Sequence, residues 1–246
     1  MTQAEPDRVE VSIEDGSKPS QKSSLSTGSA KFIMATTVIL CGAALWNSRA
    51  FGVGEAGWLL AFLIAMTIRA PHSKRNAANA IIVSFADPRE IVTLPLLLTV
   101  LVLPLVHLAG WLPASLDHRL PIGLTWLGLA LQVPYLWLFY RSHADLTRNW
   151  SPSLEIRHGH ELVTAGIYRH IRHPMYAAVA ISAVAQPLLL QNWLAGLPAV
   201  FVTILFLAVR MPAEERMMES HFGASYLAYR ELTGHLFPRL RKGRLS

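Results

Sequence analysis

Two polar clusters in the C-terminal half contain the residues best suited to chemistry. The first cluster spans residues 160–178 and contains two arginines, three histidines, two tyrosines, a glycine and a proline between long apolar runs. The second cluster, Arg210 to Glu215, closes the next apolar run. Ionisable groups beside a bilayer are costly unless they are paired or hydrated. The two clusters therefore predict a functional site, and we expect them to meet in space.

Composition indicates an integral membrane protein. The chain has 246 residues, of which 52% are hydrophobic and 15% are charged, and several apolar runs approach the roughly 20 residues that span a bilayer. The net charge of +6 comes from cations at segment ends and in the tail, as expected for cytoplasmic loops rather than for nucleic-acid binding. Cys41 is the single cysteine and lies in an apolar run, so no internal disulfide is possible.

The apolar pattern predicts an all-α, polytopic transmembrane bundle with about six spans. The runs cover residues 31–46, 52–68, 91–111, 122–140, 174–190 and 193–208. Pro134 should kink the fourth run or be absorbed by neighbouring helices. We divide the chain into a disordered, Ser-rich tail (1–30), N-terminal transmembrane helices (31–140), and a connector, helical hairpin and C-terminal helix that form the site (141–246).

The last two runs are separated only by Gln191-Asn192, and so short a turn predicts an antiparallel helical hairpin. Both ends of the hairpin return to one membrane face, which places His173 near Arg210. Most lysines and arginines lie in the loops after the second and fourth runs and in the C-terminal tail. By the positive-inside rule, these loops, both termini and the site face the cytoplasm.

The sequence after Glu215 predicts one amphipathic helix that lies in the interface or covers the site. Apolar residues recur every three or four positions, and charged residues fall largely between them. The apolar positions are Met218, Phe222, Tyr226, Tyr229 and Leu232, and the charged ones are Arg216, Glu219, Arg230 and Glu231.

Each polar motif also has a simpler explanation. Arg172 to Tyr176 suits the entry of a helix into a membrane, with proline in the first turn and snorkelling or interfacial side chains beside it. Arg210 and Glu214, four residues apart, suit an ordinary ion pair on one helix face. Spacing alone leaves both alternatives open. The histidines lack a carboxylate or thiolate set at ligand spacing, so no metal site is predicted from His158, His160, His170 and His173.

The polar motifs between Arg141 and Pro238 are informative as an ordered set. They are Leu162-Val163-Thr164, Gly166, Tyr168, Arg172-His173-Pro174, Tyr176, Arg210, Glu214-Glu215, Phe222-Gly223, Tyr226 and Tyr229. This set resembles the isoprenylcysteine carboxyl methyltransferase family, which in turn resembles the membrane phospholipid N-methyltransferases. Family members often have Gly-Pro-Tyr or Gly-Val-Tyr at residues 166–168, and usually Tyr-x-Gly where this chain has Tyr176-Ala177-Ala178.

The resemblance implies an S-adenosylmethionine-dependent methyltransferase whose cofactor pocket opens to the cytoplasm between the connector, the last two spans and the C-terminal helix. Arg210 would orient the methyl acceptor, and Glu214 would bind the cofactor. The other cofactor-binding residues that the resemblance implies are His160, Glu161, Leu162, Val163, Tyr168, His173, Pro174, Met175 and Tyr176.

The expected acceptor is the carboxylate of a lipophilic or prenylated molecule that enters sideways between spans. A carboxylate is ionised near neutral pH and needs no general base. The alternatives are a lipid amine, a sterol-type reductase that uses NADPH, and a non-catalytic lipid-binding protein. Met175 in place of Asn, and Glu214-Glu215, argue against the reductase. No nucleic-acid or protein partner is predicted.

Overall fold

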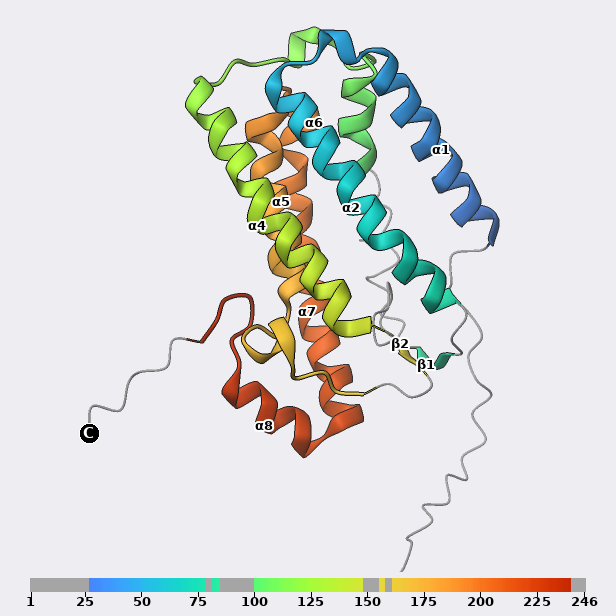
Figure 1. Ribbon diagram of the computed structural model, residues 1–246, viewed down its shortest axis with the longest axis vertical. Coiled ribbons are helices and arrows are strands. Elements are labelled where there is room, and N and C mark those ends of the chain that lie inside the picture. Colours follow the sequence, from blue (N-terminus) through green and yellow to red (C-terminus); the bar gives the residue numbers. More distant parts are fainter. Residues whose placement is uncertain (1–26, 78–80, 85–99, 148–154, 158–160, 240–246) are drawn as a thin grey trace, which may run out of the picture.

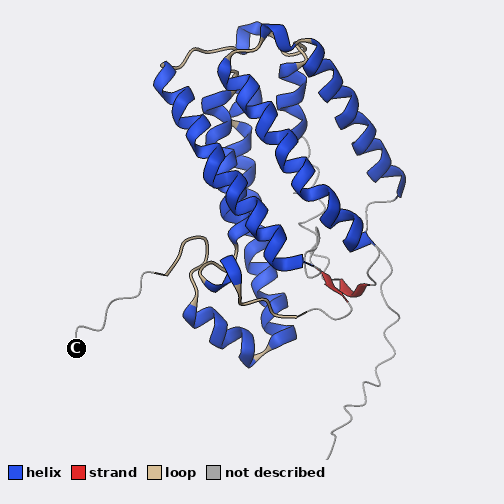
Figure 2. Cartoon of the chain, in the orientation of Figure 1, coloured by secondary structure: helices blue, strands red, loops and turns tan. Residues whose placement is uncertain are grey.

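The computed structural model describes residues 27–77, 81–84, 100–147, 155–157 and 161–239. These residues are predominantly α-helical, as predicted, and the long helices run along the long axis of the molecule (Figures 1 and 2). The predicted tail lies outside the described residues except for residues 27–30, which begin the first helix. The helices are α1 (Thr27–Trp46), α2 (Val53–Ala77), a helix over 100–108, α4 (Ile122–Leu146), α5 (Pro174–Leu189), α6 (Trp193–Gly196), α7 (Pro198–Phe222) and α8 (Ala224–Leu232).

A short antiparallel sheet departs from the all-α prediction. Strand β1 (Ile81–Ser84) pairs with β2 (Glu155–Arg157), with Ile81 opposite Arg157 and Ser84 opposite Glu155. Both segments were predicted to lie in polar loops. The Ile-Ile-Val run of β1 is β-branched, which favours extended backbone.

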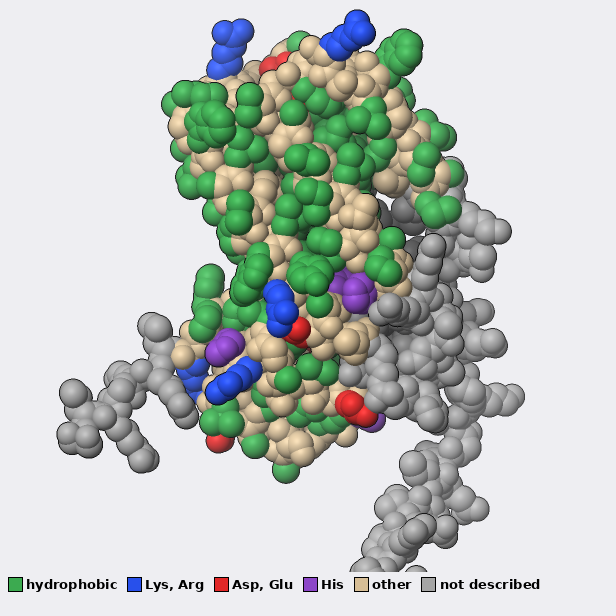
Figure 3. Space-filling view, viewed as in Figure 1, with side chains coloured by type: hydrophobic (Ala, Val, Ile, Leu, Met, Phe, Trp, Pro, Cys, Tyr) green, Lys and Arg blue, Asp and Glu red, His purple; other side chains and the backbone are tan. Residues whose placement is uncertain are grey.

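Within the residues that the structure describes, three helical segments are long and apolar enough to cross a membrane: Val53–Ser73, Ile122–Leu146 and Trp193–Phe222. Met34–Trp46 and Pro174–Leu189 are shorter apolar helices. On the face shown in Figure 3, hydrophobic side chains cover much of the upper part, while charged and histidine side chains gather below it and at the upper tips. The chain is thus an integral membrane protein. The predicted run 91–111 lies partly outside the described residues, and the six-span topology remains a prediction.

Helices α2 and α4 extend beyond the apolar runs that predicted them. Helix α2 continues to Ala77, through what was expected to be a loop from Arg69. Helix α4 continues past Tyr140 to Leu146 and contains Pro134 without ending there. An ion pair one turn apart, between Arg141 and Asp145 at 2.9 Å, supports the polar last turns of α4.

Helix α4 packs against both α5 and α2 (Figure 1), and two apolar cores hold these helices together. One core joins α1, α2, the 100–108 helix and α5 through residues that include Leu40, Trp58, Leu105 and Leu189. The other core lies nearer to the polar clusters. It consists of Ala65, Leu138, Phe139, Ile167, Tyr168, Ile171, Ala177 and Ala178.

The predicted hairpin turn between α5 and α6 is confirmed, and side chains fasten it to the loop that precedes α4. The buried Asn192 side chain accepts hydrogen bonds from the amides of Leu194 and Ala195, both at 3.1 Å, and so caps α6. Its Nδ2 donates to Asp117 Oδ1 at 2.8 Å. The Leu120 amide donates to Gln191 Oε1 at 3.1 Å. The turn is therefore both capped and cross-linked.

The prediction of one continuous amphipathic helix after Glu215 was wrong. Helix α7 runs unbroken through the second polar cluster to Phe222, and a separate helix, α8, begins at Ala224. Gly223 lies between them with a φ of +52°, a conformation that ends helices and favours glycine. Tyr226 and Tyr229 of α8 are buried as expected, whereas Leu232 is exposed.

Replacing Asn192 with alanine should destabilise the protein by about 2 kcal/mol, because a helix cap and a buried side-chain hydrogen bond are lost together. Asn192→Ser retains a capping oxygen but not the bond to Asp117, so we expect about half of that loss. Thermal unfolding in detergent measures both. Equal stability of wild type and Asn192→Ala would show that the turn does not depend on this side chain.

Candidate active site

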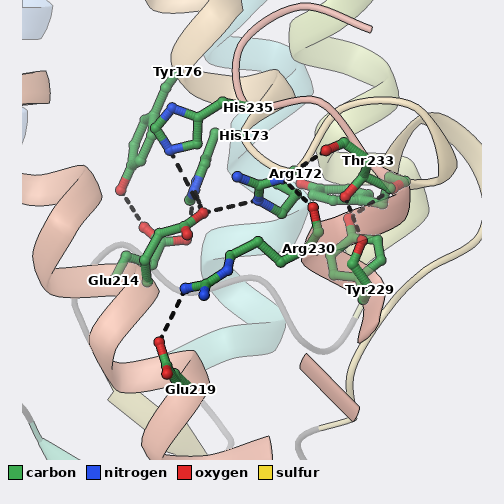
Figure 4. Close-up of polar contacts among 11 residues, drawn as sticks. Arg172, His173, Tyr176, Glu214, Glu219, Tyr229, Arg230, Thr233 and His235 are labelled. Carbon is green, nitrogen blue, oxygen red and sulfur yellow. Dashed lines mark hydrogen bonds and ion pairs between the residues drawn. The ribbon is translucent and has the colours of Figure 1, made fainter. Parts of the chain in front are cut away.

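The two polar clusters meet where the N-terminus of α5 lies against the middle of α7. The Tyr176 hydroxyl on α5 donates to Glu214 on α7 and accepts a hydrogen bond from Arg210 Nε at 2.8 Å. The next residue of α7, Glu215, contacts the residue that precedes α5: its Oε1 lies 2.9 Å from His173 Nε2. Figure 4 shows Tyr176, His173 and Glu214 converging on this point. The predicted meeting of the clusters is confirmed.

Arg210, Tyr176 and Glu214 form a polar relay that joins a buried cation to a carboxylate. Arg210 is 6% exposed, and its guanidinium also lies over the Phe206 ring, 5.6 Å from the centroid. The Tyr176 hydroxyl has one hydrogen, which Glu214 takes, so the hydroxyl faces Arg210 as an acceptor. The relay therefore fixes the direction of the guanidinium and keeps opposite charges at its two ends.

Arg172 connects α7, α8 and the start of α5. Its Nε donates to Glu215 Oε1 at 2.9 Å, and its Nη1 donates to the carbonyls of Arg230 at 3.0 Å and Thr233 at 2.7 Å (Figure 4). Those carbonyls lie at the C-terminal end of α8, where cationic side chains are favourable. One side chain thus fixes α8 and the following backbone to the site.

The backbone after α8 pairs with the residues that precede α5. Arg172 N donates to Gly234 O at 2.9 Å, His173 N to His235 O at 3.1 Å, and Gly234 N to His170 O at 3.1 Å. Ile171 and Gly234 form a parallel bridge. Sequence reasoning missed this contribution of residues 233–235, because no local pattern indicates pairing with a segment so far along the chain.

His173 lies between two carboxylates. Its Nδ1 is 3.8 Å from Glu214 Oε1, and its ring stacks on Tyr176 with centroids 5.4 Å apart. His235 approaches edge-on, with its Nε2 3.5 Å from Glu215 Oε1. Burial, together with the adjacent His173, lowers the pKa of His235 below its usual value. His235 is therefore mostly neutral at pH 7.

Glu215 accepts more contacts than any single motif suggested. Arg172 Nε and His173 Nε2 both lie 2.9 Å from its Oε1. Burial and this carboxylate raise the pKa of Tyr226, so Tyr226 remains a neutral donor. Glu215 thus holds the first cluster against α7 and α8, while its neighbour Glu214 faces Tyr176.

The connector is held by Asp145 at the end of α4. The Ile167 amide donates to Asp145 Oδ2 at 2.7 Å, and Gly166 adopts a φ of +60° to bring the backbone this close. The Tyr168 carbonyl accepts from Tyr229 Oη at 2.7 Å. Burial raises the pKa of Tyr229 to about 12, which keeps that donor protonated. Asp145 was not among the predicted residues, although its polar position after an apolar run was a signal.

The remaining predicted binding residues that the structure describes differ in burial. Tyr168 is buried beside α4, where its hydroxyl lies 3.4 Å from Ser142 O. Pro174 is the buried first residue of α5. Leu162, Val163 and Met175 are half-buried, and Glu161 is exposed. His160, like His158, lies outside the described residues.

A cleft of about 470 Å³ lies beside the network, between the connector and α8. Its volume falls within the range of small-molecule sites. Two of its lining residues, Tyr229 and Thr233, also take part in the contacts that position Tyr168 and Arg172. The lining consists of Thr164, Arg169, His170, Tyr229, Leu232, Thr233, Pro238 and Arg239. The cleft is therefore cationic and adjoins the site, but none of the predicted binding residues that the structure describes lines it.

Comparison with known proteins matches this half of the chain. The sequence model of the isoprenylcysteine carboxyl methyltransferase (ICMT) family matches residues 127–220. Protein-S-isoprenylcysteine O-methyltransferase A of Arabidopsis thaliana is 39% identical over 72 residues, which are 29% of this chain and 36% of that protein. The Schizosaccharomyces pombe protein-S-isoprenylcysteine O-methyltransferase is 40% identical over 72 residues, 29% of this chain and 30% of its own length.

A bacterial relative matches over a longer stretch. The uncharacterized protein YpbQ of Bacillus subtilis is 28% identical over 97 residues, which are 39% of this chain and 58% of that protein. By comparison, the matches with the plant and yeast relatives span only about a third of those proteins. The family model, which matches residues 127–220, covers the C-terminal half of this chain and not its N-terminal helices.

Replacing Gly166 with alanine should destabilise the protein by about 1–3 kcal/mol. A Cβ at this position would lie 2.2 Å from Asp145 Oδ2, and the φ of +60° disfavours a side chain. Gly42→Ala is the matched control, because nothing lies within 4 Å of its added Cβ and alanine favours a helix. Thermal unfolding compares the two, and equal midpoints would refute a special role for Gly166.

Proposed function

We propose that the protein is an integral membrane S-adenosylmethionine-dependent methyltransferase, and the match of residues 127–220 to the ICMT family model supports this proposal. Its proposed substrate is the carboxylate of a lipophilic acceptor of the S-prenylcysteine type. The observation that carries the proposal is the relay from Arg210 through Tyr176 to Glu214. It places an anion-binding group and a cation-binding group within one side-chain length of each other, as a carboxylate acceptor and a sulfonium donor require.

Arg210 is the residue proposed to bind the acceptor carboxylate. It is buried near the polar end of α7, where a low local dielectric strengthens a charge-assisted contact. Its Nε is already directed at Tyr176, so the guanidinium plane is set before the acceptor arrives. Such preorganisation lowers the cost of aligning two reactants.

Glu214 and the neighbouring aromatic rings are chemically suited to the cofactor. Glu214 is half-buried and offers a carboxylate for an ammonium or for ribose hydroxyls, and Tyr176 offers a ring face for a sulfonium. The adjoining cleft supplies Arg169 and Arg239 as partners for a carboxylate. When bound, S-adenosylmethionine supplies an electrophilic methyl group. The other residues assigned to its binding are His160, Glu161, Leu162, Val163, Tyr168, His173, Pro174 and Met175.

The geometry suits an acid acceptor better than an amine acceptor. A carboxylate is already ionised at neutral pH and requires no proton removal. A protonated amine beside the Arg210 guanidinium would meet a like charge and would have to lose a proton first. We therefore infer that the protein aligns the reactants and excludes water, and that no side chain acts as a general base.

Arg210 and Glu214 should separate acceptor binding from cofactor binding. Arg210→Ala should lower methyl transfer to an S-prenylcysteine acid by more than about 100-fold, because a charged hydrogen-bond partner is lost, while cofactor affinity changes about twofold or less. Glu214→Gln should weaken cofactor binding by about tenfold. Calorimetry and a methyl-transfer assay measure the two effects.

Glu219→Gln is the control for these variants, because Glu219 lies on the same helix and pairs with Arg230 at the surface, at 3.1 Å. It should resemble wild type in both assays. Cofactor affinity unchanged in Glu214→Gln would remove the role assigned to Glu214. Transfer to an amine lipid in preference to the acid would overturn the proposed acceptor.

We also propose a multi-pass topology with the site on the cytoplasmic side, and residues 31–140 and 141–246 as the N-terminal helices and the methyltransferase region. Ser115 and Ser225 are exposed on the loop before α4 and on α8, respectively, and this topology places them on opposite sides. In a Cys41→Ser background, Ser115→Cys should react with an impermeant maleimide on intact cells. Ser225→Cys should react only after permeabilisation, and the reverse pattern would invert the orientation.

A further inference from the structure

A second chemical feature of the site uses residues from three separate segments. The ligand atoms of His173, Glu215 and His235 all lie within 4.8 Å of one another. These side chains come from the start of α5, from α7, and from the segment after α8. We propose that His173, Glu215 and His235 bind a zinc ion, with water as the fourth ligand. This site does not depend on the proposed methyl transfer.

The observed distances suit a tetrahedral ion. Zinc bonds of about 2.0–2.2 Å to nitrogen and oxygen place neighbouring ligand atoms about 3.3 Å apart. His173 Nε2 and His235 Nε2 lie 2.9 Å and 3.5 Å from Glu215 Oε1. Both nitrogen–oxygen distances differ from the ideal separation of ligand atoms by only a few tenths of an ångström. Two imidazoles and one carboxylate are also a ligand set that zinc uses with an open fourth position.

Two of the ligands have neighbouring polar groups. Glu214 Oε1 lies 3.8 Å from His173 Nδ1, on the side from which a carboxylate orients a metal-bound imidazole. Arg172 Nε donates to Glu215 Oε1 at 2.9 Å. A carboxylate has about four acceptor sites, so a metal can take the place of the His173 contact while the Arg172 contact remains.

The site is open at His235, whose side chain is 44% exposed, whereas that of His173 is 4% exposed. An ion can therefore reach the buried His173 and the half-buried Glu215 from the His235 side. A bound ion would join the segment after α8 to α7 through side chains, in addition to the backbone pairing of that segment with residues 170–173. Nitrogen ligands favour zinc over magnesium or calcium, which prefer oxygen.

Zinc binding is tested on the full chain, purified without a histidine tag. Equilibrium dialysis against zinc chloride, followed by elemental analysis, should show one zinc per wild-type chain. The midpoint of thermal unfolding should rise by about 5 °C at saturating zinc and remain unchanged with magnesium. His235→Ala should retain no zinc and show no rise. His235 is partly exposed, so this variant should still fold.

His170→Ala is the matched control, because His170 is an exposed histidine of the same connector and lies outside the three ligands. It should bind zinc as wild type does. Failure of wild type to retain zinc, or full retention by His235→Ala, would overturn the proposal. Because these measurements involve no methyl donor, their outcome is separate from that of the methyl-transfer assays.

Discussion

The contacts of Arg172 are the constraint on which the candidate site depends. A single guanidinium binds Glu215 of α7 and the carbonyls of Arg230 and Thr233 at the end of α8. A charge this close to the membrane is stable only because its donors meet a carboxylate and helix-terminal carbonyls. Through these contacts, three segments that are distant in sequence are held at one point. His173 and Tyr176 can then face Glu214, Glu215 and Arg210.

Polar contacts at the two ends of the α5–α7 hairpin hold the site together. At one end of the hairpin, Asn192 caps α6 and binds Asp117, and these contacts fix the turn between the end of α5 and the start of α7. At the other end, the relay from Arg210 to Glu214 crosses between the same two helices. The apolar packing between these ends carries no specificity for ligands. The polar contacts at both ends therefore determine the relative positions of the two helices, and with them the chemistry of the site.

Much of this arrangement was predictable where the signal was local. The two-residue turn at Gln191-Asn192 required a hairpin, and the hairpin required His173 and Arg210 to be close. The break at Gly223 was predictable from the glycine itself, but the heptad-like spacing of Phe222, Tyr226 and Tyr229 concealed it. Its φ of +52° makes the chain turn where periodicity alone would continue the helix.

Long-range contacts were beyond prediction from one sequence. Nothing near His235 indicates that its carbonyl accepts from His173 N, or that its ring lies beside Glu215. Asp145 likewise holds Ile167 through a hydrogen bond that depends on how α4 ends. Those partners are chosen by tertiary packing. The residue types alone allow them many other partners.

The pairing of residues 170–173 with Gly234 and His235 bears on the order in which the molecule is made. All the described helices are synthesised before residues 233–235, which pair with the backbone that precedes α5. The membrane helices can thus be inserted while Arg172 still lacks its carbonyl partners. A nascent chain, or one shortened by a premature stop codon just after α8, would have its transmembrane framework but would lack the pairing of residues 170–173 with Gly234 and His235. Maturation of the site is in this sense a post-insertion event.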